Sequence, residues 1–193
     1  MEKRDIETFC PASQQDWREW LKENHYSKQS VWLVYYKKKS NVSSITYSDA
    51  VDEALCFGWI DSTRKSLGNE MFMQFFCKRK PGSVWSKINK GKVERLIDSG
   101  LMTRAGFDSI ETAKRNHSWT ILDEVEELII PEDLTDGFRS KRASQEYFLS
   151  LSKSVRKSIL QWLVLAKRPE TRQKRIAEIA ELAAQKLKPK QFR

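Results

Sequence analysis

Several features that mark common protein classes are missing from this sequence of 193 residues. No window approaches the roughly 18 consecutive apolar residues that a membrane-spanning helix needs, and the N-terminus has no apolar stretch of signal-peptide length. The three cysteines, Cys10, Cys56 and Cys77, are too widely spaced to indicate a disulfide framework or a zinc motif. We therefore expect a cytoplasmic protein with reduced cysteines and no membrane span.

The motifs of well-known chemistry are missing as well. There is no glycine-rich phosphate loop, nucleophile elbow or metalloprotease helix. The two histidines, His25 and His117, fall near predicted helix ends without a Cys, Asp or second His at metal-ligand spacing, which favours structural roles. Cys56 lies on the apolar face of a predicted helix, so we interpret it as a core residue and not as a nucleophile. We predict no metal, no cofactor and no catalytic residue, and we favour a binding protein over an enzyme.

The charge of the chain is unevenly distributed. The net charge of +9 divides into +5 for residues 1–122, −7 for residues 123–136 and +11 for residues 137–193. We interpret these segments as a main domain, an acidic connector and a basic helical C-terminal module. The Lys and Arg residues of the module either solvate its amphipathic helices, which we favour, or present a surface for nucleic acid.

Hydrophobic patterning places strands early and helices late. Capping-box spacing predicts helices that begin at Ser13 and Thr46, and the second of these ends at Gly58. Runs rich in β-branched and aromatic residues predict strands over 31–37, 59–67 and 71–79, the last two joined as a hairpin. Later segments have helical spacing, and Pro169 suits the first turn of a final helix. The fold class we predict is α+β: a small antiparallel sheet of about three to five strands packed with helices, followed by an all-helical module.

The end of the helix at Gly58 supplies the first candidate site residues. The segment "GWID" places Trp59 and Asp61 at a helix-to-strand junction. A carboxylate at such a junction can accept backbone N–H bonds, pair with an arginine, or act as an acid or base. We favour a structural role for Asp61, and the acid–base role is the alternative.

A second group of candidates lies in the segment "KRKPGSVWSKIN". Its cations, Arg79 among them, end a predicted strand. The helix that follows opens with four polar or aromatic residues: Ser83, Trp85, Ser86 and Asn89. Cations beside a helix N-terminus favour anions, whereas in the alternative the serines cap the helix and the tryptophan packs in the core. The predicted hairpin returns this segment toward Trp59 and Asp61, which would complete a ligand-binding corner.

The last predicted helix carries a third group of candidates. At 100° per residue, Arg168, Arg172 and Arg175 fall within about 60° of one another, at the margin of the apolar stripe. That position suits a salt bridge to another element, which we favour, or an anion site to which these arginines contribute.

Several blocks in a fixed order resemble a known family. They read "SVWLVYYKK", "ITYSDAVDEALCFGWID", "SVWSKIN", "VERLIDSGLMTRAG" and "LSKSVRKSILQWLVLAKRPETRQKRI". Together they are similar to the bacteriocin-protection family described as YdeI or OmpD-associated (OmdA), over about residues 17–182, and residues 137–190 resemble the part that names the family. The resemblance implies a bacterial cytoplasmic protein linked to antimicrobial-peptide tolerance or envelope stress, and it carries over no catalytic residue.

Three functions follow from these observations. The first is a stress-response or antimicrobial-protection protein that binds a small anionic ligand or a protein partner at the corner. The second is a nucleic-acid-binding protein that uses the basic C-terminal helices, with affinity that falls steeply with salt. The third is an enzyme that uses Asp61 as acid or base. We favour the first.

Overall fold

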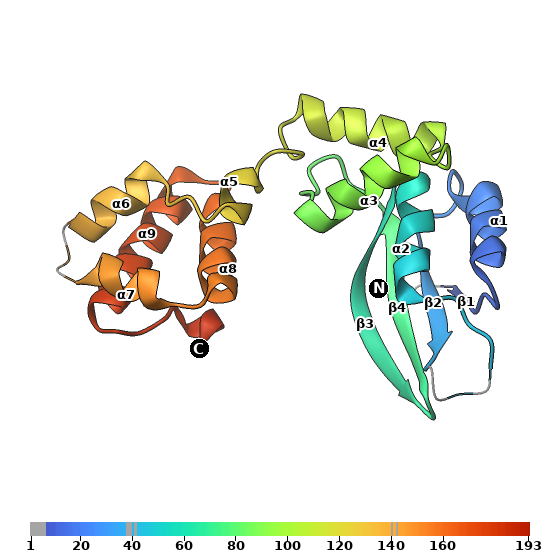
Figure 1. Cartoon of the computed structure of the whole chain (residues 1–193), viewed down its shortest axis with the longest axis horizontal. Helices are drawn as coiled ribbons and strands as arrows, with labels where there is room; N and C mark the ends of the chain where they lie inside the picture. Colours follow the sequence, from blue (N-terminus) through green and yellow to red (C-terminus); the bar gives the residue numbers. More distant parts are fainter. Residues whose placement is uncertain (1–6, 38–39, 41, 140, 142) are drawn as a thin grey trace, which may run out of the picture. The chain divides into compact units, whose positions relative to one another are not determined.

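The computed structural model describes residues 7–37, 40, 42–139, 141 and 143–193. The chain divides into two compact units, Met1–Trp119 and Thr120–Arg193, which we describe separately (Figure 1). The acidic residues predicted to form a connector belong to the second unit, where they contribute to two helices. No helix in the described part of the chain has both the length and the apolar character needed to cross a membrane.

The first unit combines a sheet with helices, which confirms the α+β class. Its strands are β1 (Thr8–Phe9), β2 (Ser30–Tyr36), β3 (Trp59–Gly68) and β4 (Met71–Lys78). Its helices are α1 (Gln14–Asn24), α2 (Tyr47–Cys56), α3 (Lys87–Asp98) and α4 (Arg104–Arg115). The described strands form one sheet in the order β1-β2-β4-β3. We predicted an antiparallel sheet, but it is mixed, because the short β1 pairs with β2 in parallel while the other neighbours are antiparallel.

Local signals account for where the helices begin. The hydroxyl of Ser13 accepts a hydrogen bond from the Asp16 backbone at 3.1 Å, and Thr46 caps α2 in the same way at 3.2 Å. Each bond satisfies one of the backbone N–H groups that the first turn of a helix leaves without a partner. The helix starts predicted at Ser13 and Thr46 are therefore confirmed.

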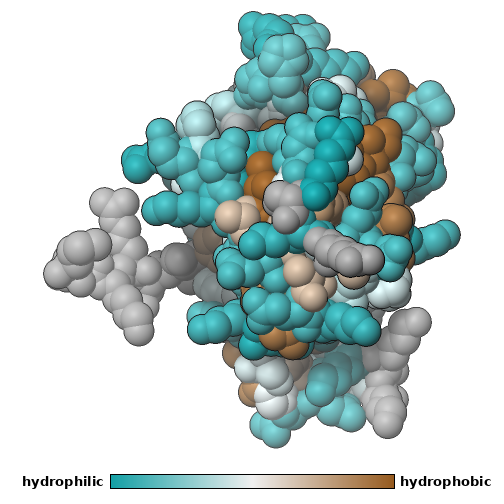
Figure 2. Space-filling model, turned by 90° about the vertical axis from the view of Figure 1, so that its left-hand side faces the viewer, coloured by the Kyte–Doolittle hydropathy of each residue, from teal (hydrophilic) through white to brown (hydrophobic). Residues whose placement is uncertain are grey.

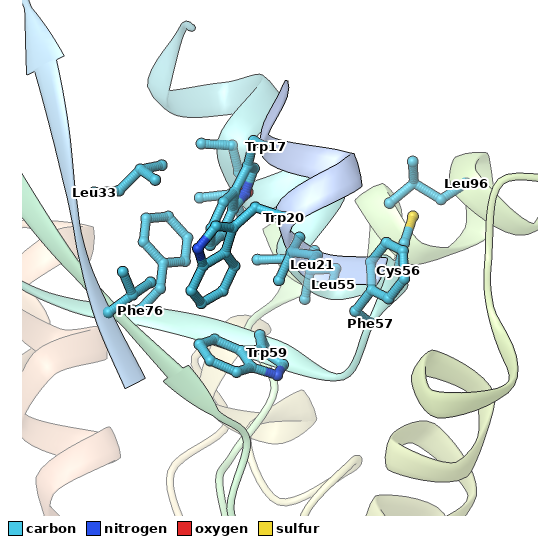
Figure 3. Packing of buried hydrophobic residues seen from close by; sticks show 14 of the residues in the cluster. Trp17, Trp20, Leu21, Leu33, Leu55, Cys56, Phe57, Trp59, Phe76 and Leu96 are labelled. Carbon is cyan, nitrogen blue, oxygen red and sulfur yellow. The ribbon is translucent and has the colours of Figure 1, made fainter. Parts of the chain in front are cut away.

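The core of the first unit lies between α1, α2 and one face of the sheet. Alternate residues of β2, namely Val31, Leu33 and Tyr35, are buried, as expected for a strand with one covered face. The rings of Trp17 and Trp20 stack at 5.1 Å between their centroids, and Figure 3 shows them packed among the other apolar side chains of the cluster. Burial of these large rings supplies much of the hydrophobic stabilisation of the unit.

The described residues of the second unit form helices and the loops that join them, with no strand among them. Its elements are α5 (Asp123–Glu126), α6 (Glu132–Arg139), α7 (Ser144–Ser150), α8 (Lys153–Val164), α9 (Pro169–Ala184) and the 3₁₀ turn η1 (Lys190–Phe192). Pro169 occupies the first turn of α9, as predicted. Its core is made by apolar residues from different helices, such as Leu134, Phe148 and Leu163. Figure 2 shows that the visible face of the chain is mostly hydrophilic, in keeping with a charged content of 32%.

Candidate functional site

The junction between α2 and β3 can form only because residue 58 is glycine. Gly58 has a φ of +70°, and a Cβ atom there would lie 2.8 Å from the carbonyl oxygen of Ala105. The start of α4 is held against this junction, because the Thr103 hydroxyl donates to the Cys56 carbonyl oxygen at 2.6 Å. The Arg79 backbone N–H donates to the Gly58 carbonyl oxygen at 2.9 Å and brings the end of β4 to the same place.

A cavity of about 310 Å³ lies where these segments meet in the first unit. Aromatic rings, cations and small or hydroxyl-bearing side chains line it: His25, Tyr26, Phe57, Gly58, Trp59, Lys78, Arg79, Lys80, Pro81, Trp85, Ala105, Asp108, Ser109 and Thr112. The rings come from α1, the α2–β3 junction and the segment before α3, while the cations come from the end of β4. An apolar cavity with a few polar groups is the usual form of a small-molecule site.

Arg79 is the most unusual side chain of this cavity. Its guanidinium carbon lies 3.6 Å from the ring centroid of Trp85, and its Nη1 donates to the Val84 carbonyl oxygen at 3.0 Å. Its Nε and Nη2 atoms are buried and have no hydrogen-bond partner among the described residues. Burial lowers the pKa of Arg79 to about 10, although the charge of Asp61 acts in the opposite direction. A buried cation with two unused donors is an unfavourable arrangement unless something else binds it.

The two tryptophans of the cavity also have unused donors. Trp59 and Trp85 are each 1% exposed, and the structure gives their indole N–H groups no acceptor within the described residues. A buried tryptophan usually directs its N–H to a partner. Together with Arg79, the lining residues therefore carry four buried donor nitrogens without acceptors among the described residues.

Lys78, Asp108 and His25, which also line the cavity, have partners within the protein. The ammonium of Lys78 donates to the Tyr26 carbonyl oxygen at 2.7 Å, and the carboxylate of Asp108 pairs with Arg104 at 2.8 Å. His25 donates from Nδ1 to the Leu21 carbonyl oxygen at 2.8 Å, which is the helix-end contact predicted for it. No group of three or more potential metal ligands occurs in the described part of the chain.

The structure brings together three of the predicted site residues of the first unit. Trp59, Arg79 and Trp85 line the cavity. Asp61 does not, and lies two residues farther along β3. There its carboxylate accepts hydrogen bonds from the Tyr47 hydroxyl at 2.7 Å and from Gln74 Nε2 at 3.1 Å. Both partners are side chains of the same unit, which agrees with the structural role that we favoured for Asp61.

The polar residues at the start of α3 are also outside the cavity lining. Ser86 caps the helix, because its hydroxyl accepts a hydrogen bond from the Asn89 backbone at 3.2 Å. Ser83 lies in the turn after β4, where its backbone N–H donates to the Lys80 carbonyl oxygen at 2.9 Å. The alternative we gave from the sequence, capping serines beside a packed tryptophan, therefore describes these residues.

The three predicted arginines of α9 belong to the second unit. Arg172 forms a two-pronged salt bridge with Asp133 of α6, with Nε and Nη2 at 2.5 and 2.9 Å from the two carboxylate oxygens. Arg175 donates to the Trp162 carbonyl oxygen and lies over the Trp162 ring. Arg168 is exposed at the N-cap of α9. The salt bridge between elements that we favoured is confirmed for Arg172.

Sequence reasoning missed the wall that α4 contributes. Ala105, Ser109 and Thr112 line the cavity and follow one another at intervals of four and three residues, which places them on one face of the helix. Such a face of small side chains was a readable signal, since it allows close approach of another segment. Phe57 was missed because an apolar residue at a helix end carries no sign of a cavity.

Comparison with known proteins identifies two families. Residues 9–109 match the family described as "Domain of unknown function (DUF8412)", and residues 127–186 match the family "Bacteriocin-protection, YdeI or OmpD-Associated". The second match is shorter than the resemblance to that family inferred from the sequence, which began at about residue 17. No curated protein and no solved structure matches the chain. The chain therefore belongs to the DUF8412 family in its first unit and carries in its second unit a domain of the bacteriocin-protection, YdeI or OmpD-associated family.

Proposed function

We propose that the first unit binds a small anionic ligand in the cavity around Arg79, and that this binding serves protection against bacteriocins or related stress. The observation that carries the proposal is the lining of the cavity, in which the cations at the end of β4, Arg79 among them, lie beside aromatic rings. Cations at the wall of a partly apolar cavity favour a negatively charged ligand, because an opposite charge offsets the cost of their partial removal from water. The proposal assigns no reaction to the site.

The size and charge of the cavity support the same class of ligand. A volume of about 310 Å³ is at the lower end of the range of about 300–1,000 Å³ that is usual for ligand pockets. Three consecutive cations, Lys78, Arg79 and Lys80, line it, while the carboxylate of Asp108 is already paired with Arg104. The electrostatic balance of the walls therefore favours negative charge.

The link to bacteriocin protection rests on the second unit. Residues 127–186 belong to a family described by that role and by association with OmpD. We propose that the second unit provides this role and that ligand binding in the first unit accompanies it. A protein partner remains the other candidate for what the chain binds.

The proposal can be tested by thermal unfolding of the full chain with phosphate, acetate, glucuronate or AMP. A ligand at 100 times its Kd stabilises the folded state by about 2.7 kcal/mol. We expect at least one of these anions to raise the Tm of the wild type but not of Arg79→Gln. Arg64→Gln is the matched control. Arg64 also lies over an aromatic ring, that of Phe72 in β4, but it is outside the cavity. Unchanged Tm values for all four anions, or equal shifts in Arg79→Gln, would disprove the proposal.

A further inference from the structure

We propose that the open face of the sheet in the first unit binds single-stranded nucleic acid, whose bases stack on Trp32 and Phe75. This surface is separate from the cavity around Arg79, so the proposal does not depend on the function assigned to that cavity. It also differs from the nucleic-acid surface suggested by the sequence, because that surface was assigned to the basic C-terminal helices.

Alternation along β2 and β4 gives the sheet two different faces. Val31, Leu33 and Phe76 point to the covered face, where they belong to the core cluster to which α1, α2, α3 and α4 all contribute. The residues between them in sequence point the other way. We call this second side the open face, and its apolar residues in the two strands are Trp32, Val34, Tyr36, Met71, Met73 and Phe75.

The open face is apolar, although the helices of the unit pack against the other face. Its six apolar side chains are partly exposed, and none of them belongs to the core cluster. An antiparallel sheet face that meets only water usually carries polar side chains. Three aromatic rings and two methionines on such a face therefore indicate a surface for a partner.

The aromatic rings lie at the centre of this face. Trp32 and Phe75 are paired directly across β2 and β4, the two central strands, and their ring centroids are 5.1 Å apart. Tyr36 lies farther along β2, at a distance of about 13 Å from Trp32. Every nucleobase has a flat face that can stack on an aromatic ring, and the bases of a single strand are free to do so. The paired rings therefore offer a platform for unpaired bases.

The charge of the open face suits a polyanion. Lys65 of β3 pairs with Met73 of β4, and its ammonium lies 4.6 Å from the ring centroid of Trp32. Lys65 is exposed, and its flexible chain lets a base take its place on the ring while the ammonium moves to a phosphate. No Asp or Glu occupies an open-face position of β2, of β4 or of the paired part of β3. Residues 1–122 carry a net charge of +5, which adds to the attraction.

The same charges argue against a second copy of this chain as the partner. A symmetric dimer brings one face against itself, so Lys65 would need a carboxylate on the same face. The paired open-face positions provide none. A polyanion that carries flat apolar groups matches both the cation and the rings, and this is the chemistry of single-stranded nucleic acid.

Fluorescence anisotropy of labelled oligonucleotides with the full chain tests the proposal. The probes are a thymidine strand of about 15 nucleotides, an abasic strand with the same number of phosphates, and a duplex of the same length. We expect the thymidine strand to bind at least about tenfold more tightly than the abasic strand, because only the former has bases that can stack. The duplex should also bind about tenfold more weakly, because its bases are already stacked on one another.

Three variants show whether the open face is the surface that binds. Phe75→Leu keeps an apolar side chain but removes the ring, so it should weaken binding of the thymidine strand about fivefold or more. Phe107→Leu is the matched control, because Phe107 is 38% exposed on α4 and is not part of the sheet. Lys65→Gln should reduce the slope of log affinity against log salt concentration by about 0.7, as expected for the loss of one phosphate contact.

The wild type alone can overturn the proposal, whether or not the variants fold. Equal binding of the thymidine and abasic strands, or no binding of either, would do so. Equal affinities of Phe75→Leu and the wild type would place the nucleic acid on another surface, such as the basic C-terminal helices, and would also overturn it. A wild-type dimer in analytical ultracentrifugation that dissociates in Phe75→Leu would identify a second copy as the partner instead.

Discussion

The guanidinium of Arg79 lies 3.6 Å from the ring centroid of Trp85, with its Nε and Nη2 atoms buried and unused among the described residues. Contact with the ring offsets part of the free energy lost when the cation leaves water, since a desolvated cation–π pair contributes about 2 kcal/mol. Contact with a ring does not satisfy the two in-plane N–H groups. The pair therefore keeps a charge buried at a net cost in stability, which is typical of residues retained for function.

Replacing Arg79 by methionine should stabilise the protein in the absence of ligand. The change removes the buried charge and keeps an apolar side chain on Trp85, so we expect the free energy of unfolding to rise by about 1 kcal/mol. Urea denaturation followed by circular dichroism measures it. The control Arg64→Met, at an exposed arginine that also lies on a ring, should stay within about 0.5 kcal/mol of the wild type. A loss of stability in Arg79→Met would mean that the guanidinium has a structural role.

Two glycines with the same backbone conformation should differ in their tolerance of alanine. Gly58 and Gly68 have φ values of +70° and +74°, but only at Gly58 would a Cβ atom meet a backbone oxygen, that of Ala105 at 2.8 Å. Gly68→Ala should cost about 1–2 kcal/mol, the penalty of left-handed backbone alone. Gly58→Ala should cost about 1–3 kcal/mol more, because α4 must shift. Chemical denaturation of both variants provides the comparison, and equal losses would show that α4 does not constrain the junction.

A buried ion pair joins α1 to α2. Arg18 Nη1 lies 2.6 Å from the Glu53 carboxylate, whose side chain is 3% exposed, and Gln14 also donates to this carboxylate at 2.6 Å. Glu53→Gln leaves the arginine without its counter-charge, so we expect a loss of about 3 kcal/mol or more. Glu19→Gln breaks the exposed pair with Lys22 and should cost less than about 0.5 kcal/mol. Urea denaturation measures the free energy of unfolding of both variants. Similar losses in the two would contradict the claim that burial makes the pair of Arg18 and Glu53 more important than the exposed pair.

The salt bridge between Asp133 and Arg172 should make the second unit sensitive to acid. The hydrogen bond from Arg172 lowers the pKa of Asp133 in the folded chain. A lowered carboxylate pKa stabilises the fold at neutral pH, and this stabilisation is lost as the pH falls below the ordinary aspartate value of about 3.9 and through the folded value. Asp133→Asn should therefore cost about 1 kcal/mol at pH 7 and progressively less below pH 4.

Urea unfolding of the wild type and Asp133→Asn at several pH values measures this difference. Asp136→Asn, which breaks an exposed pair with Arg139 in the same helix, is the control and should show a small effect at every pH. If the difference in unfolding free energy between wild type and Asp133→Asn stays constant down to pH 2, the salt bridge of Asp133 does not make stability depend on pH.

Short-range signals in the sequence were sufficient for most of the fold. Ser13, Thr46 and Ser86 cap helices through backbone groups three residues away, and such contacts depend on little beyond the local residues. The hairpin of β3 and β4 followed from two strand patterns around a glycine-containing turn. The parallel pairing of β1 was not predicted, because two residues carry no recognisable alternation and their pairing depends on a strand more than 20 residues away.

The candidate site depended on tertiary contacts. The hairpin predicted from the amino-acid sequence alone returns the end of β4 toward Trp59. The structure pairs Trp59 with Lys78, the neighbour of Arg79. Only the tertiary structure placed the small residues of α4 opposite them and directed Asp61 to Tyr47 and Gln74 instead. It also decided that Arg172 is neutralised by Asp133 while Arg79 is not. A sequence records which side chains carry charge, but whether a buried charge has a partner depends on segments that meet only in the folded chain.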